Sequence, residues 1–187
     1  MRFIHFPIDV KHAPVITDFA KVAFPPERPV RFFVGVQRSR SSYKGTDIML
    51  RALRRLEAER PDEVQVVAVE NLPFDEYKRA MLSCDVLLDQ LYSYTPAMNA
   101  LQAMAQGLVV VGGGEPESYD LLGCADLRPI VNVLPDENDV YEKLRDLVDH
   151  KARIPQLSHE SRLYTERYHD HLKVAQAYVD FWQSRKN

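Results

Sequence analysis

The sequence predicts a doubly wound α/β domain, in which helices cover both faces of a parallel sheet. Short apolar runs alternate along the chain with longer segments whose apolar residues recur at helical spacing. Several of the short runs are apolar at nearly every position, which is typical of strands buried on both faces. With 187 residues, the chain is long enough for one such domain.

Five segments have the composition of strands, rich in valine, leucine, isoleucine or phenylalanine. The predicted strands are residues 31–36, 64–69, 85–91, 108–111 and 129–133. Parallel sheets of this class bind ligands outside the carboxyl ends of their strands. The loops after Val36, Val69, Leu91 and Val111 are therefore the candidate binding loops.

Helical patterns occupy the segments between and after these strands. The predicted helices are residues 46–59, 75–82, 95–106, 115–122 and 136–150, with a helical tail over 155–184. Thr46 and Asp136 can cap the helices that begin there. Gly107 suits the position just after a helix C-terminus, where a left-handed backbone is common.

Net charge and cysteine content exclude several classes of protein. The net charge of −3 leaves no broad basic field for nucleic acid, so any anion site has to be local. Cys84 and Cys124 lack CxxC spacing and are predicted to pack as small apolar groups, which suits a reducing compartment. No apolar run approaches the ~18 residues of a membrane span, and no histidine has metal-ligand spacing to a cysteine or carboxylate.

A basic loop follows the first predicted strand. Residues 35–47 read GVQRSRSSYKGTD and place Arg38, Arg40 and Lys44 just ahead of a predicted helix. Arginine can hold phosphate oxygens through two hydrogen bonds, and a helix N-terminus favours anions. The loop is therefore a candidate phosphate site, with a solvated basic turn as the alternative. It lacks the GxxxxGK[ST] spacing of a Walker loop.

A second candidate anion site lies at the start of the helix predicted over residues 95–106. Thr95 can accept a hydrogen bond from a first-turn amide, and Pro96 suits the first helical position. This helix start and the basic loop would meet in one cleft, which suits a diphosphate. Asn99 and Gln102 can offer amides to ligand hydroxyls, or else face solvent. The residues expected to face the diphosphate from this helix are Thr95, Ala97, Met98 and Asn99.

Three glycines, Gly112 to Gly114, follow the fourth predicted strand. Glycine permits a tight turn or the close approach of another backbone. Glu115 and Glu117 can then hydrogen-bond sugar hydroxyls or favour the start of the next helix. Because the run lacks the GxGxxG pattern, a structural role is the favoured interpretation.

These segments together resemble the C-terminal domain of family-4 retaining glycosyltransferases, which have the GT-B fold. The resemblance depends on the order and spacing of KGTD (44–47), LPFDEYKRAMLSCDVLL (72–88) and LQAMAQGLVVV (101–111). It extends from about Phe33 to Gly114. The opening FIHFPIDV is also similar to the linker that precedes this domain in the family.

The resemblance implies a Rossmann-like domain that binds a nucleotide-diphosphate sugar. Residues 1–30 would be an inter-domain linker and residues 31–187 a single donor-binding domain, with the N-terminal acceptor domain absent from this chain. Lys44, with Arg40 or Arg38, matches the family residues that hold the diphosphate. Residues 95–98 match the backbone that faces the donor sugar and phosphate.

The sequence departs from the family at both carboxylates of its E-x7-E motif. Tyr94 occupies the first glutamate position, and Gln102 occupies the second, which binds the ribose in the family. A neutral amide can still bind ribose, but neither residue supplies a carboxylate near the reacting centre. We therefore assign no catalytic residue from the sequence.

The function implied by the resemblance is retaining, hexosyltransferase-like transfer to an acceptor glycan or a lipid-linked acceptor, without a metal or other cofactor. The isolated chain is expected to be inactive, because the acceptor would bind the other half. We expect polysaccharide or other glycan assembly in the cytoplasm, with peripheral membrane contact of the full-length protein left open. The alternatives are a nucleotide-sugar-binding module without catalysis and, ranked last, a nucleotide-sugar epimerase.

Overall fold

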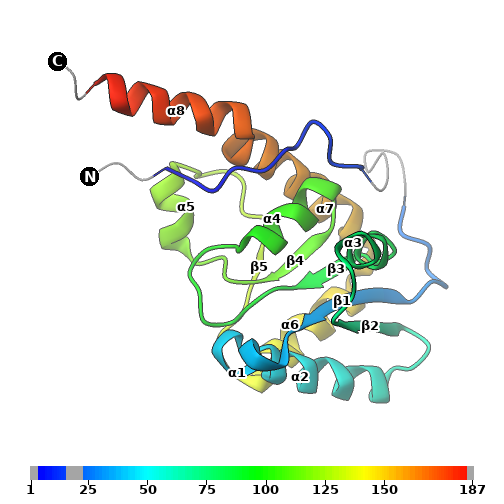
Figure 1. The fold of residues 1–187 in the computed structure, drawn as a ribbon. Helices are drawn as coiled ribbons and strands as arrows, with labels where there is room; N and C mark the ends of the chain where they lie inside the picture. The colour runs from blue at the N-terminus through cyan, green and yellow to red at the C-terminus, as the bar shows by residue number, and fades with distance from the viewer. Residues whose placement is uncertain (1–3, 16–22, 185–187) are drawn as a thin grey trace.

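The computed structural model describes residues 4–15 and 23–184, and five strands of this part form one parallel sheet (Figure 1). The strand order is β2-β1-β3-β4-β5, which confirms the predicted doubly wound α/β class. The strands are β1 (Val30–Val36), β2 (Val64–Glu70), β3 (Val86–Leu88), β4 (Val109–Gly112) and β5 (Val131–Asn132). The strands predicted over 85–91 and 129–133 are thus shorter than expected, because their ends belong to loops.

Helices connect the strands and form the C-terminal tail. Their bounds are α1 (Ser41–Lys44), α2 (Thr46–Glu59), α3 (Phe74–Leu82), α4 (Met98–Gln106), α5 (Pro116–Leu122), α6 (Glu137–Asp149), α7 (Ile154–Tyr164) and α8 (His171–Gln183). Short 3-10 turns cover Arg38–Arg40 and Lys151–Arg153, and a π-helical turn covers Thr165–His169. The helical tail is therefore confirmed, although it is divided by the π turn.

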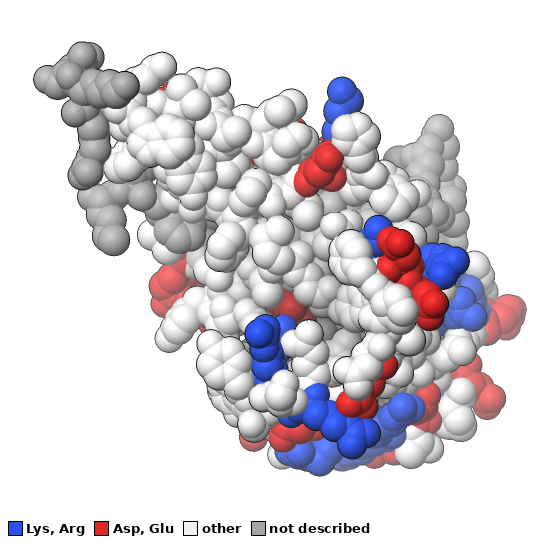
Figure 2. All heavy atoms as spheres, in the orientation of Figure 1, with Lys and Arg blue, Asp and Glu red and all other residues white. Residues whose placement is uncertain are grey.

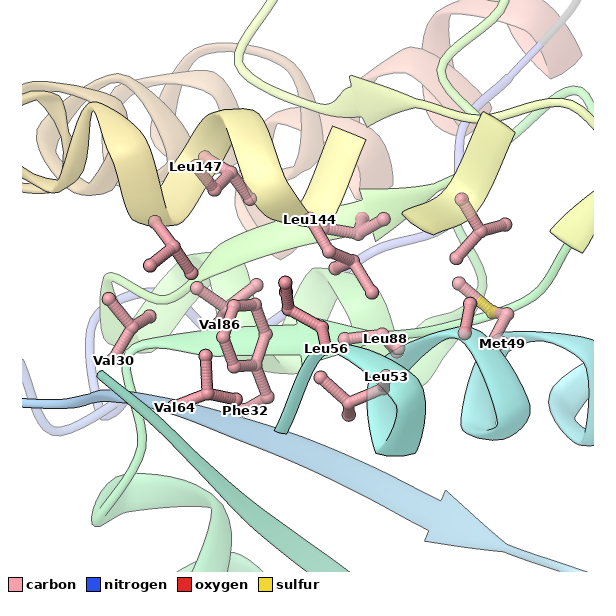
Figure 3. Close-up of a cluster of buried hydrophobic side chains, with 14 of the residues drawn as sticks. Val30, Phe32, Met49, Leu53, Leu56, Val64, Val86, Leu88, Leu144 and Leu147 are labelled. Atoms are coloured by element: carbon pink, nitrogen blue, oxygen red, sulfur yellow. The ribbon is translucent and has the colours of Figure 1, made fainter. Parts of the chain in front are cut away.

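Alternate residues of each strand supply the two faces of the sheet. Phe32 packs on the side of α2 and α6, whereas its neighbour Phe33 packs on the side of α3 and α4, and both are fully buried. Figure 3 shows the first of these layers, with side chains from β1, β3, α2 and α6 interdigitated. Each leucine buried there contributes about 1.5–3 kcal/mol of transfer free energy.

The structure corrects two predicted helix caps and confirms two other helix ends. Thr46 is the first residue of α2, and its N-cap is Gly45, whose φ of 71° is left-handed. The helix predicted from Thr95 begins at Met98 instead, so neither Thr95 nor Pro96 has its expected position. Asp136 does cap α6, because its side chain accepts the Asn138 and Asp139 amides, and Gly107 has a φ of 89° after α4.

The N-terminal segment lies along the C-terminal part of the chain, as Figure 1 shows. The Ile8 N–H donates to the His169 carbonyl at 2.7 Å, and the His171 N–H donates to the Ile8 carbonyl at 3.0 Å. Arg162 donates to the Val10 carbonyl at 2.8 Å. Ile8 and Val10 are also buried in a small cluster with two residues of α4, Leu101 and Ala105. Residues 4–10 of the predicted linker are thus attached to the domain.

His169 is the most buried titratable group of this attachment. It is 5% exposed, its Nδ1 lies 2.9 Å from the Phe6 carbonyl oxygen, and burial lowers its pKa to about 4. Burial also lowers the pKa of His5, whose ring lies 5.8 Å from that of His169. A histidine with a lowered pKa stabilises the fold above its unfolded pKa, and this contribution is lost as pH falls toward 4.

We therefore expect the free energy of unfolding to fall by about 2 kcal/mol as pH is lowered from about 6.5 to 4.5. His169→Asn keeps an amide that can donate to Phe6 but cannot titrate in this range. Urea unfolding at several pH values should show a much flatter profile for this variant. Equal slopes in the variant and the wild type would contradict the assignment to His169.

Candidate functional site

A cavity of about 460 Å³ lies at the carboxyl ends of β1, β2 and β3. The sheet order places β1 beside β3, while the chain leaves β1 for α2 on one face and β3 for α4 on the other. Doubly wound sheets bind their ligands at such a switch point. The lining residues include Gly35, Lys44, Asn71, Tyr77, Asp89 and Asn99.

Lys44 is the predicted cation that lines this cavity. It is the last residue of α1, and its carbonyl accepts the Leu91 N–H at 2.8 Å, which ties α1 to the loop after β3. Gly45 follows it with a positive φ, and a Cβ there would lie 2.8 Å from the Leu91 side chain. The glycine therefore permits both the turn and the packing that position Lys44.

Arg38 and Arg40 lie on the preceding 3-10 turn, and neither lines the cavity. Arg38 is paired with Glu70 at 2.7 Å, and its side chain is 84% exposed. Arg40 is also exposed. Figure 2 shows Lys and Arg side chains over the part of this face near α1 and α2, interspersed with Asp and Glu. The basic loop thus contributes one cation to the cavity wall and two to its surroundings.

The start of α4 is bonded to Asp89, a residue to which the sequence analysis assigned no role. Asp89 directly follows β3, and its Oδ2 accepts the Ala97 N–H at 3.0 Å. The Ala97 amide, expected to face the diphosphate, therefore already has an acceptor within the protein. The Thr95 N–H is bonded to Ser93 Oγ at 3.3 Å, and the Thr95 side chain caps nothing. The available sequence signal was an acidic residue inside the apolar run predicted as the strand 85–91.

Asp89 is a buried carboxylate in the cavity wall. The residue is 5% exposed, and its Oδ1 is buried without a hydrogen-bond partner among the described residues. Burial raises the pKa of Asp89, while the Ala97 N–H and the charge of Lys44 act in the opposite direction. A buried acceptor without a hydrogen bond costs free energy of folding, so Asp89 is not the residue that would give this position the highest stability.

Asn99 is the predicted polar side chain of α4 that lines the cavity. Its Oδ1 accepts the Tyr77 hydroxyl at 3.0 Å, and the Tyr77 ring meets Phe33 edge-on at 5.0 Å between centroids. A Cβ at Gly35 would overlap the Tyr77 hydroxyl, so the glycine makes room for this contact. The sequence analysis missed Tyr77, because an aromatic residue on the apolar face of a helix is predicted to pack in the core.

The remaining predicted residues lie around the cavity and not in its wall. Gln102 lines a neighbouring hollow of about 570 Å³, and Phe74 lines both hollows. Met98 is 45% exposed and Tyr94 is 66% exposed. The structure therefore does not bring the two positions of the family motif, Tyr94 and Gln102, together with Lys44 in one cavity wall.

Gly112, Gly113 and Gly114 are buried and pack against neighbouring loops. A Cβ at Gly113 would overlap the carbonyl oxygen of Ser93, and one at Gly114 would lie 2.8 Å from the Ile130 side chain. The Gly114 N–H donates to Asn132 Oδ1 at 3.0 Å. The glycine run thus lets the loop after β4 support the loop that leads into α4, which is a structural role.

The described residues contain no group of three or more His, Cys, Asp or Glu arranged to hold a metal ion. In the same part of the chain, no helix is both long and apolar enough to cross a membrane.

Gly113→Ala is expected to lower the free energy of unfolding by about 1–3 kcal/mol, because the new methyl group forces the backbone at Ser93 to move. Gly123→Ala is the control, since Gly123 has a φ of 65° but no atom within 4 Å of the added Cβ. The control should cost about 1–2 kcal/mol of backbone strain and leave the loop at Ser93 undisturbed. Urea unfolding would measure the loss of stability in both variants. Fluorescence of Tyr92 and Tyr94, which flank Ser93, would report movement of this loop. Unchanged stability of Gly113→Ala would refute the close approach.

Asp89→Asn is expected to stabilise the chain at pH 7, because it removes a buried charge and keeps an oxygen for the Ala97 N–H. A rise of roughly 2–4 °C in melting temperature corresponds to about 1 kcal/mol in a domain of this size. An acid with a raised pKa destabilises the fold at high pH, so the difference should shrink as pH falls and the wild-type carboxyl is protonated. Calorimetric melting between pH 7 and 4 measures this, and a lower melting temperature at pH 7 would contradict it.

No family model and no curated protein sequence matches this chain. Solved structures do match it. A sucrose-phosphate synthase from Thermosynechococcus elongatus has a TM-score of 0.67 at 16% identity, over 98% of this chain and 52% of that chain. Anabaena HepE, in a complex with UDP and glucose, has a TM-score of 0.66 at 13% identity, over 97% and 56% of the two chains.

The third neighbour is a domain of similar length. The C-terminal domain of a group 1 family glycosyl transferase, LpcC from Francisella tularensis, has a TM-score of 0.58 at 14% identity, over 87% of this chain and 98% of that one. This chain spans about half the length of the synthase and HepE chains. The neighbours are GT-B glycosyltransferases, and identities this low compare folds only. The chain has the Rossmann-like fold of one half of a GT-B glycosyltransferase.

Proposed function

We propose that the cavity at the switch point binds a nucleotide-diphosphate sugar, and that the chain is the donor-binding part of a glycosyltransferase. The observation that carries this proposal is that Lys44 and Asn99, from the first turn of α4, line the same cavity. The volume of about 460 Å³ is within the range of small-ligand pockets. HepE, which shares the fold, was crystallised with UDP and with UDP-glucose.

Lys44 and the start of α4 provide positive charge that suits a diphosphate. Lys44 supplies a cation, and the first-turn amides of Met98, Asn99 and Ala100 have no acceptor among the described residues. Such amides carry partial positive charge at a helix N-terminus. Arg40, on the adjoining turn, adds to the local potential that attracts an anion, whereas the charge of Arg38 is offset by its pairing with Glu70. The diphosphate contacts proposed here are those of Lys44 and of the amides that follow Ala97.

These groups would assist departure of the nucleoside diphosphate. Negative charge on its phosphates grows in the transition state, so fixed donors stabilise that state more than the bound substrate. The proposed transfer proceeds with retention and needs no metal ion, because Lys44 and the amides neutralise the leaving group. The acceptor, a glycan or a lipid-linked acceptor in the cytoplasm, would bind a separate N-terminal domain. The isolated chain would then bind the donor without transferring it.

A binding module without catalysis is the second candidate. Tyr94 and Gln102 motivate it, since neither is a carboxylate and Gln102 lines the neighbouring hollow. This candidate predicts that the chain joined to its partner domain binds the nucleotide sugar but neither transfers nor hydrolyses it. Detectable donor turnover would exclude it.

Calorimetric titration with UDP, GDP and ADP tests the proposed site. We expect saturable binding of one nucleotide, and a loss of about tenfold or more in affinity for Lys44→Ala, because a charged hydrogen bond to phosphate is removed. Arg38→Ala and Arg40→Ala should each weaken binding only about two- to threefold, as exposed charges do. Lys143→Ala, an exposed lysine of α6, is the matched control. Absence of binding by any nucleotide, or an equal effect of Lys143→Ala, would sink the proposal.

A further inference from the structure

Asp89 has unused hydrogen-bonding capacity at the candidate site. Its Oδ2 accepts the Ala97 N–H at 3.0 Å, while its Oδ1 has no partner among the described residues. The residue is 5% exposed and lines the cavity. Buried polar atoms in folded proteins are almost always hydrogen-bonded, so an unpaired carboxylate oxygen in a cavity wall points to a missing donor.

Among the described residues, no side chain supplies that donor. The Tyr77 hydroxyl, which lines the same cavity, donates to Asn99 instead. Lys44 influences Asp89 electrostatically but forms no ion pair with it. The local structure therefore holds the carboxylate in place through Ala97 and leaves its second oxygen available to a group that enters the cavity.

The chemistry of a carboxylate selects the kind of ligand group. Phosphate oxygens are acceptors and carry negative charge, so Asp89 repels them, whereas a hydroxyl group can donate a hydrogen bond to it. Lys44, in contrast, attracts phosphate. The cavity wall thus offers both a cation, which suits a diphosphate, and a carboxylate, which suits hydroxyl groups, and a nucleotide sugar contains both kinds of group.

We propose that Asp89 determines specificity by accepting a hydrogen bond from a hydroxyl group of the bound nucleotide sugar. The proposal rests on the proposed function and names a residue outside the E-x7-E positions. Asp89 supplies at the cavity a carboxylate that Tyr94 and Gln102 do not. The hydroxyl belongs either to the ribose or to the transferred sugar, and both sources offer the same chemistry.

The test compares ratios of affinities, because Asp89→Asn also removes a charge that repels phosphate. Calorimetry would measure the wild type and Asp89→Asn with UDP, 2′-deoxy-UDP, 3′-deoxy-UDP and the glucose, galactose and N-acetylglucosamine conjugates of UDP. GDP or ADP and their analogues replace UDP if the titrations above identify another base. Asp62→Asn is the control, since Asp62 is exposed and lies before β2, at the opposite edge of the sheet. Melting temperatures confirm that each variant is folded.

A ribose contact predicts that Asp89→Asn reduces the preference for UDP over one deoxy form by about tenfold. A sugar contact predicts that the variant loses a similar factor of its preference for one sugar conjugate over UDP. Asp62→Asn should change neither ratio. If the wild type binds and both ratios are unchanged in Asp89→Asn, the role of Asp89 is overturned while the proposed function stands. Failure of the wild type to bind any nucleotide would overturn the proposed function and this role with it.

Discussion

Burial of the central strands on both faces is the constraint on which the remaining structure depends. Phe32 and Phe33 are neighbours in β1, point to opposite faces, and are both fully buried. Every backbone polar group of such a strand has to be bonded within the sheet. The first polar side chains that can meet a ligand therefore occur where the strands end. This is why Lys44, Asp89 and Asn99, which come from different connections, share one cavity at that edge.

Close packing of the loops at this edge supports the site. The glycine at position 113 lets the loop after β4 approach Ser93, and Gly45 lets α1 approach Leu91. The Ala97 N–H bond then attaches the start of α4 to Asp89. Asp89 stays buried with an oxygen that has no hydrogen-bond partner among the described residues, which costs stability. Such a conflict is expected at a functional site, where local rules of good packing are set aside.

The N-terminal segment of the described chain is joined to the turn between α7 and α8. Residues 4–10 lie against α4 and the turn around His169, through main-chain bonds and through Arg162. Leu101 and Ala105 of α4 pack against this segment, while Asn99 of the same helix lines the cavity. One helix thus contacts both the N-terminal segment and the candidate site. The position of α4 depends on both sets of contacts.

The sequence alone determined the fold class, the order in which strands and helices follow one another along the chain, and the presence of a local cation ahead of α2. Apolar periodicity carries this information, because burial on one or two faces is encoded residue by residue. Tertiary structure decided which polar groups share the cavity. Thr95 does not cap α4, Gln102 lines the neighbouring hollow, and Asp89 takes the Ala97 amide, none of which follows from spacing. The start of a helix and the direction of its side chains depend on contacts between segments far apart in the chain, and these are defined only once the sheet has formed.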